Sequence, residues 1–233
     1  KVGVGIKGGT MSVSKPPVSE SIQKFLTHCH RREFSAKASI IRQGDTAGEL
    51  YYIIAGSVTV LLEDDKGHEI VLAYLNPGDF FGEIGLFNED ASRSALVRAR
   101  TVCEIAQISY PKLRSLTDLY PDLIIAMTTQ LARRLRNTNR KLGDLAFMDV
   151  YGRVARTFLD LCAQPHAMTP PDGMQVRVTR QELARLVGWS REWVGKVLKD
   201  MEDQKHVAVS GKNVVVLGVS AKPAYSKAQA IKA

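Results

Sequence analysis

A glycine-rich string around residue 82 has the residue types best suited to binding chemistry. It reads Gly78-Asp79-Phe80-Phe81-Gly82-Glu83-Ile84-Gly85-Leu86-Phe87, and Arg93-Ser94-Ala95 follows it. Glycines let backbone N–H groups converge on an anion, Ser94 adds a hydroxyl donor, and Arg93 offers a guanidinium fork for two phosphate oxygens. Glu83 would be repelled by a phosphate unless its carboxylate accepted a hydrogen bond from a sugar hydroxyl. Spacing alone favours equally a sugar-phosphate site and ordinary turn glycines with Arg93 paired to Glu83 or Asp90.

The longest helical pattern of the chain runs from Pro121 to Phe147, with Pro121 in its first turn and Gly143 near its end. Seven side chains recur every three or four residues and predict a seam that packs against a second helix: Ile124, Met127, Leu131, Leu135, Thr138, Leu142 and Leu145. The opposite face is basic and suits either solvent or anions: Arg133, Arg134, Arg136, Arg140 and Lys141. Thr138 in the seam and Asn139 beside it are polar, so they need a partner or a ligand.

Residues 39–108 must supply the scaffold for the glycine-rich string. They form short apolar runs of strand length, separated by turn sequences such as Gly44-Asp45 and Ala55-Gly56. Many short strands joined by tight turns, without helical crossovers, predict an antiparallel jelly roll or small barrel. We expect a short amphipathic helix over residues 19–30, capped by Ser19, to precede it.

The C-terminal part has the pattern of a helix-turn-helix with a wing. Asp149 suits the cap of a helix over residues 151–162, and a proline-rich surface loop is expected over residues 164–175. Thr179-Arg180-Gln181-Glu182 is a capping box that opens a helix broken at Gly188, and Ser190 caps the next. Two valine runs, 207–209 and 214–216, predict a β-hairpin. A helical hairpin with a solvated face is the alternative, and the basic second helix favours DNA.

The exposed face of this second helix carries side chains that match base edges. Arg191 can pair with guanine O6 and N7, Glu192 can accept from cytosine N4, and Lys196 can reach guanine as a point charge. Arg180 and Ser190 are expected to contact phosphates. Trp193 can lie against a sugar or a thymine methyl group.

Composition bounds the class of protein. The 233 residues are 45% hydrophobic, enough for two cores, and no apolar run reaches the ~20 residues of a membrane helix. We therefore expect a cytoplasmic protein without membrane contact. The net charge of +8 is concentrated after residue 147, as DNA binding requires. The cysteines and histidines form no metal-binding or catalytic pattern, so neither a metal site nor an enzyme is predicted.

Several strings together resemble the CRP/FNR family of transcription regulators, over about residues 25–218. They are Gly82-Glu83-Ile84-Gly85-Leu86-Phe87, Arg93-Ser94-Ala95, Leu50-Tyr51-Tyr52-Ile53, Asp144-Leu145-Ala146-Phe147 and Arg180-Gln181-Glu182-Leu183. The resemblance implies that Arg93 and Ser94 hold the cyclic phosphate of cAMP, that Glu83 takes the ribose 2′-OH, and that Gly82 adds a backbone contact. It also implies that Thr138 meets the adenine of its own subunit's ligand and Asn139 that of the other subunit. The family pattern has serine at Asn139, and asparagine could relax the choice of base.

The resemblance also implies a domain plan and partners. The expected class is α+β, with a flexible leader (1–18), a cyclic-nucleotide-binding jelly roll (19–120), a dimerisation helix (121–147), a winged helix-turn-helix domain (148–218) and a flexible tail (219–233). The homodimer would bind a palindromic double-stranded DNA operator and contact RNA polymerase through the 164–175 loop, with His30 and Lys112 at matching positions. Rivals are a regulator responding to cGMP or cyclic di-GMP or to no ligand, an Fe–S or haem sensor, a phosphodiesterase, and a regulatory or channel module.

Overall fold

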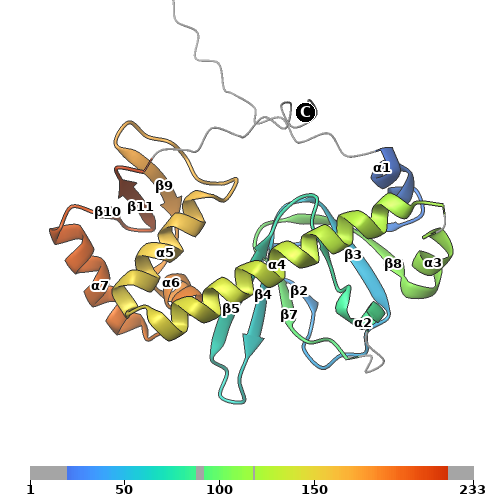
Figure 1. Cartoon of the computed structure of the whole chain (residues 1–233), viewed down its shortest axis with the longest axis horizontal. Coiled ribbons are helices and arrows are strands. Elements are labelled where there is room, and N and C mark those ends of the chain that lie inside the picture. The colour runs from blue at the N-terminus through green and yellow to red at the C-terminus, as the bar shows by residue number, and fades with distance from the viewer. Residues whose placement is uncertain (1–19, 88–91, 118, 220–233) are drawn as a thin grey trace, which may run out of the picture.

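The computed structural model describes residues 20–87, 92–117 and 119–219, in two lobes joined by one long helix (Figure 1). The expected leader, and the tail after Val219, lie outside these residues. The lobe with most of the sheet is N-terminal, and the helical lobe lies beyond the C-terminal end of the long helix, α4 (Figure 1). None of the helices in the described ranges combines the length and apolar character needed to cross a membrane.

The N-terminal lobe is a jelly roll of two antiparallel four-stranded sheets, as the sequence predicted. One sheet has the order β1-β8-β3-β6 and the other the order β2-β7-β4-β5. The strands are β1 (His30–Phe34), β2 (Ser39–Ile41), β3 (Glu49–Ala55), β4 (Val58–Glu63), β5 (Glu69–Leu75), β6 (Phe80–Phe81), β7 (Leu96–Ala99) and β8 (Cys103–Ser109). Ile53, Val58 and Ile105 are fully buried in the core that contains side chains of both sheets. Burial of these β-branched side chains stabilises the packing of the two sheets against each other.

One strand and two short helices of this domain were not indicated by the apolar pattern, and the first helix is shorter than predicted. β1 is polar and mostly exposed, and only its pairing with β8 makes it a strand. The first helix, α1 (Glu20–Leu26), ends before His30, so the predicted extension to residue 30 is wrong; its predicted cap, Ser19, lies outside the described residues. Two further helices, α2 (Ile84–Phe87) and α3 (Tyr110–Leu116), lie after β6 and β8.

The long helix α4 (Pro121–Phe147) has the predicted bounds, but the side chains of its predicted seam are buried near its start and exposed farther along. Leu123 and Met127 are buried in the core cluster of the jelly roll, so Met127 does not belong to a surface left for a second helix. Farther along, Leu135 is 62% exposed and Leu142 is 66% exposed. The first turns of α4 therefore anchor it to its own domain, while the later turns present apolar side chains on the surface.

The C-terminal lobe is a winged helix-turn-helix. It contains α5 (Val150–Cys162), α6 (Arg180–Val187) and α7 (Arg191–Asp203), and its three strands, in the order β10-β11-β9, are β9 (Gly173–Arg177), β10 (Val207–Ser210) and β11 (Asn213–Leu217). Val154, Leu183 and Val194 are buried in one core drawn from the three helices. Asp149 caps α5, as predicted, by accepting from the Gly152 N–H. The predicted 164–175 loop is wrong at its last three residues, which pair with β11 in strand β9.

The helix α6 packs against the sheet that contains β5 and β7. The Tyr74 hydroxyl donates to Glu182 Oε1 at 2.6 Å, and Arg185 pairs with Glu69 at 2.9 Å. Leu186 packs against the apolar side chains of β4, β5 and β7. Glu182 was predicted to complete a capping box. The structure records the Thr179 half of that box, in which the Glu182 N–H donates to Oγ1, and it directs the Glu182 carboxylate to the other domain.

Candidate functional site

The main cavity of the described residues lies between the jelly roll and α4. Its volume is about 690 Å³, within the range of small-molecule sites, ~300–1,000 Å³. It is bounded by side chains of β4, β5 and β7, by the glycine-rich string and by α4, and on its C-terminal side by residues of α5 and α6 and by Ala163 and Gln164 after α5. Five of the predicted ligand-binding residues line it: Gly82, Glu83, Arg93, Ser94 and Thr138. Residues that are up to 56 positions apart in sequence therefore meet at one cavity.

Arg93 is held in a defined position inside this site. It is only 8% exposed, and its guanidinium donates to the carbonyls of Gly82 and Glu49 and to the Tyr110 hydroxyl, at 3.0–3.1 Å. The rings of Tyr51 and Tyr110 lie 5.5 and 6.0 Å from its Cζ. The alternative of a surface pair between Arg93 and Glu83 is therefore wrong, and Asp90 lies outside the described residues.

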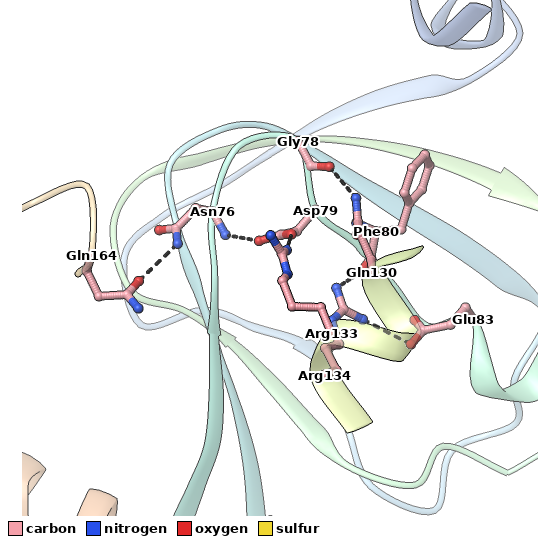
Figure 2. Close-up of polar contacts among 9 residues, drawn as sticks. All are labelled: Asn76, Gly78, Asp79, Phe80, Glu83, Gln130, Arg133, Arg134 and Gln164. Carbon is pink, nitrogen blue, oxygen red and sulfur yellow. Dashed lines mark hydrogen bonds and ion pairs between the residues drawn. The ribbon is translucent and has the colours of Figure 1, made fainter. Parts of the chain in front are cut away.

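Glu83 pairs instead with Arg134 of α4, whose Nη1 lies 3.0 Å from Glu83 Oε1 (Figure 2). Arg134 also donates to the Phe80 carbonyl and lines the cavity. The sequence placed Arg134 on a charged outer face, so this residue of the site was missed. Its spacing was a usable signal, because Arg134 and Thr138 are four residues apart and must lie on one side of the helix.

Asn139 differs from the other predicted ligand residues. It is exposed and does not line the cavity, which on this part of α4 is lined by Asn137 and Thr138. Within one chain, therefore, Thr138 joins the site and Asn139 does not.

Gly82 is required where the chain passes Arg93. Its φ of +80° is in the left-handed region, and a Cβ built there would lie 2.8 Å from Arg93 Nη1 and 3.1 Å from the Glu49 carbonyl oxygen. A side chain at this position would displace the guanidinium or strain the backbone. The glycine therefore has a specific role in the site as well as in the turn.

Two tyrosines beside Arg93 remain protonated at neutral pH. Burial raises the pKa of Tyr51 to about 12, assisted by the neighbouring Glu49 carboxylate. Burial also raises the pKa of Tyr110, against the opposing effect of the Arg93 charge. Tyr110 donates to the Gly82 carbonyl and accepts from Arg93, so its neutral hydroxyl links the glycine-rich string to the guanidinium.

A second candidate surface is the exposed face of α6 and α7. All six residues predicted for DNA are exposed there: Arg180, Ser190, Arg191, Glu192, Trp193 and Lys196. Gly188 ends α6 with a φ of +69°, and Ser190 then caps α7 by accepting from the Trp193 N–H. The left-handed turn places the start of α7 on the surface, where its first turn is available to a duplex.

The two tryptophans near the start of α7 have different environments. Trp189 stacks with Arg153, whose Cζ lies 4.8 Å from the ring, so it packs against α5. Trp193 is 54% exposed, and the Lys196 ammonium lies 4.9 Å from its ring. Trp193 and Lys196 thus form one composite apolar and cationic surface.

Comparisons with known proteins agree with both surfaces. Residues 31–120 match the cyclic nucleotide-binding domain, and residues 152–221 match the Crp-like helix-turn-helix domain. The cAMP-activated global transcriptional regulator Vfr of Pseudomonas aeruginosa is 54% identical over 89% of this chain and 99% of its own. The chain belongs to the CRP/FNR family of transcription regulators.

Two further relatives of this CRP-family regulator are similar over most of its length. The cAMP-activated global transcriptional regulator CRP of Salmonella typhimurium is 51% identical over 89% of this chain and 99% of its own. The solved structure of the c-di-GMP responsive global regulator CLP of Xanthomonas campestris has a TM-score of 0.80 and 46% identity, covering 85% of this chain and 98% of that one. These relatives are regulators and not enzymes, in agreement with the sequence prediction.

Proposed function

We propose that this regulator acts as a homodimer that binds cAMP in the cavity beside α4 and reads a palindromic DNA operator with α7. The observation that supports this function best is the composition of the cavity. One cavity combines a buried arginine, a serine hydroxyl and a glycine-rich backbone with a carboxylate and the side chains of a long helix. These are the groups that a cyclic sugar phosphate requires.

Arg93 and Ser94 would bind the cyclic phosphate, and Gly82 would add a backbone contact. The three recorded bonds of Arg93 use three of the five guanidinium N–H donors, so the group can also serve a phosphate oxygen. Glu83, held by Arg134, would accept from the ribose 2′-OH. Pairing orients this carboxylate and places the Arg134 charge beside it, which lowers the cost of placing it near the phosphate.

The base would contact α4 at Thr138, and Asn139 would reach the ligand of the partner subunit. The exposed apolar side chains of α4, including Leu135, Leu142 and Leu145, would pack against the same helix of a second copy. Asn139 lies on the later turns of α4 together with these leucines. Dimerisation would therefore add this residue to the cavity.

The α7 helices of such a dimer would enter successive major grooves, about 34 Å apart, a spacing known for helix-turn-helix dimers that include this family's founder. Arg191, Glu192 and Lys196 would contact base edges, Trp193 a sugar or thymine methyl, and Arg180 and Ser190 phosphates. cAMP would shift the dimer toward this arrangement only by binding it more tightly than the other arrangement. Bound DNA must then raise the affinity for cAMP by the same factor by which cAMP raises the affinity for DNA. We further propose that residues 164–172, His30 and Lys112 face RNA polymerase.

The domain division that we propose is 19–120 for the ligand domain, 121–147 for the dimerisation helix and 148–218 for the DNA-binding domain. Helix α6 of the DNA-binding domain packs against β5 of the ligand domain. The two domains are thus in direct contact as well as connected through α4.

The function is tested by calorimetry of the full chain with cAMP, cGMP and cyclic di-GMP, with wild type and Arg93→Leu compared. We expect cAMP to bind wild type and Arg93→Leu to lose at least about tenfold in affinity, since a charge-assisted contact to phosphate is removed. Equal cAMP affinity of the two proteins would refute the phosphate role. Preference for cyclic di-GMP would assign this chain the ligand of its Xanthomonas relative instead.

A further inference from the structure

The segment from Asn76 to Glu83 is attached to α4 by Gln130, which has no role in the site described above. The side-chain oxygen of Gln130 accepts from the Phe80 N–H at 2.9 Å, and its amide nitrogen donates to the Gly78 carbonyl at 2.8 Å (Figure 2). Both ends of one amide are used, so its orientation is fixed. Gln130 therefore fixes the backbone that enters the cavity wall at Gly82.

Asp79 lies in the same segment and connects it to α4. It also binds Asn76, the first residue of the segment. Its Oδ1 accepts from Arg133 at 2.8 Å, and its Oδ2 accepts from the Asn76 N–H at 2.9 Å. Arg133 and Arg134 follow Gln130 by three and four residues, so all three lie on the side of α4 that faces the segment (Figure 2). The segment and this turn of the helix are thus one polar unit.

Asn76 extends this unit to the DNA-binding domain. Its side-chain amide donates to Gln164 Oε1 at 3.1 Å, and Gln164 directly follows α5 and its C-cap (Figure 2). Asn76 is the first residue after β5, and Gly82 and Glu83 at the far end of the segment line the cavity. The segment therefore forms part of the cavity wall at Gly82 and Glu83, and at Asn76 it contacts the other domain through Gln164, which also lines the cavity.

We propose that the Asn76–Gln164 hydrogen bond couples the two sites, and that Gln130 is a positioning residue for the segment that carries it. The proposal rests on the proposed function. A ligand that shifts the wall at Gly82 and Glu83 changes the position of Asn76, and with it the stability of the contact with Gln164. A contact that differs in strength between two arrangements biases their equilibrium by that difference.

The test is the ratio of cAMP dissociation constants without and with saturating symmetric duplex DNA, measured by calorimetry on the full chain. A net amide hydrogen bond corresponds to roughly a 2- to 10-fold effect. We expect Asn76→Ala and Gln164→Ala each to reduce the ratio by about this factor, and the double variant to reduce it no further, because one contact is lost in every case. The cAMP affinity of Asn76→Ala without DNA should stay within about twofold of wild type, because Asn76, unlike Gln164, does not line the cavity.

Two further variants separate coupling from general damage. Gln130→Ala should weaken cAMP binding even without DNA, since it releases the cavity wall itself. The exchange Asn76→Gln with Gln164→Asn keeps an amide pair of the same combined length and should restore most of the ratio. Gln43→Ala, which truncates an exposed amide in the turn after β2, is the matched control and should leave the ratio unchanged.

An unchanged ratio in Asn76→Ala and Gln164→Ala, or effects of the two that simply add, would overturn the coupling role. Unchanged cAMP affinity in Gln130→Ala would overturn the positioning role. Failure of the wild-type chain to bind cAMP, or an equal affinity with and without DNA, would be a different result. It would refute the proposed function, and this inference with it.

Discussion

Glu83 and Arg134 form an ion pair across 3.0 Å that joins the glycine-rich string to the long helix α4. Both side chains line the main cavity, and the Glu83 side chain is almost completely buried. The pair therefore contributes both to the stability of the domain and to the shape of the candidate ligand site. Its two contributions can be separated by measuring unfolding without nucleotide.

Arg134→Leu should lower the free energy of unfolding by about 1–3 kcal/mol, because it leaves a buried carboxylate without its partner. Adding Glu83→Gln to this variant should recover part of the loss, since the unpaired charge is then removed. Urea unfolding at pH 7 without nucleotide measures both. Arg133→Leu is the matched control, since Arg133 is largely exposed and its pair with Asp79 should contribute less than ~1 kcal/mol. Equal losses in the two arginine variants would contradict this prediction.

Gly82→Ala should weaken cAMP binding by at least about tenfold, since the new Cβ would displace the Arg93 guanidinium and its phosphate contact. It should also cost about 1 kcal/mol in stability, because alanine tolerates a positive φ poorly. Gly67→Ala provides the comparison, since Gly67 has a φ of +78° in the β4–β5 turn and lacks close contacts. That variant should lose stability while binding cAMP normally. Calorimetry measures the cAMP affinity of both variants, and urea unfolding measures their stability. A similar loss of cAMP affinity in both would disagree with the steric explanation.

Tyr74→Phe should loosen the contact between α6 and β5 while leaving each domain folded. The variant removes a 2.6 Å hydrogen bond to the Glu182 carboxylate, worth about 1.5–3 kcal/mol when partly buried. Amide hydrogen exchange should therefore become faster in α6, which is measured by mass spectrometry. Tyr151→Phe removes a comparable hydroxyl contact within the C-terminal domain and should not change exchange in β5. Unchanged protection of α6 in Tyr74→Phe would show that the Arg185–Glu69 pair and the packing of Leu186 hold the domains together without this hydrogen bond.

Glu69 predicts a loss of stability in acid. A hydrogen bond from Arg98 lowers the pKa of this carboxyl, and the charge of Arg185 on α6 acts in the same direction. Because the folded pKa lies below the unfolded one, ~4.3, the unfolded chain binds more protons as the pH falls. The stabilisation is complete above the unfolded pKa and is lost as the pH falls through the folded pKa. The difference in unfolding free energy between wild type and Glu69→Gln should therefore shrink from pH 7 to pH 3, and urea titrations at several pH values test this.

Arg180 and Arg191 should fail in different ways when they are replaced by alanine. Arg180→Ala should weaken binding to all duplexes and reduce the slope of log affinity against log salt by about 0.9, as expected for one lost phosphate contact. Arg191→Ala should cost about 1–3 kcal/mol on the preferred operator and much less on others, because it loses a base contact. Fluorescence anisotropy with a symmetric operator and a scrambled duplex, over a range of salt concentrations, distinguishes them. The same loss on both duplexes for Arg191→Ala would remove its specificity role.

Much of the fold followed from local patterns. The helix α4, the caps Asp149, Thr179 and Ser190, and the turn at Gly188 depend on side chains and backbone preferences within a few residues, so the sequence specified them. The polar strand β1 was missed for the opposite reason, since its only signal is its pairing with β8, which lies about seventy residues later. The first helix was predicted to run too far because the apolar pattern does not show that His30 begins strand β1 and pairs with β8.

The sequence by itself determined which groups the candidate site can offer to a ligand, because glycine, arginine, serine and glutamate occur together near residue 82. Only the tertiary structure decided which partners these groups have. Arg134 meets Glu83, Tyr110 meets Arg93, and Glu182 leaves its own capping box for Tyr74, each across at least 17 positions in the chain. Such contacts depend on how α4 and α6 pack against the jelly roll, and packing is set by the shape of both surfaces rather than by local spacing.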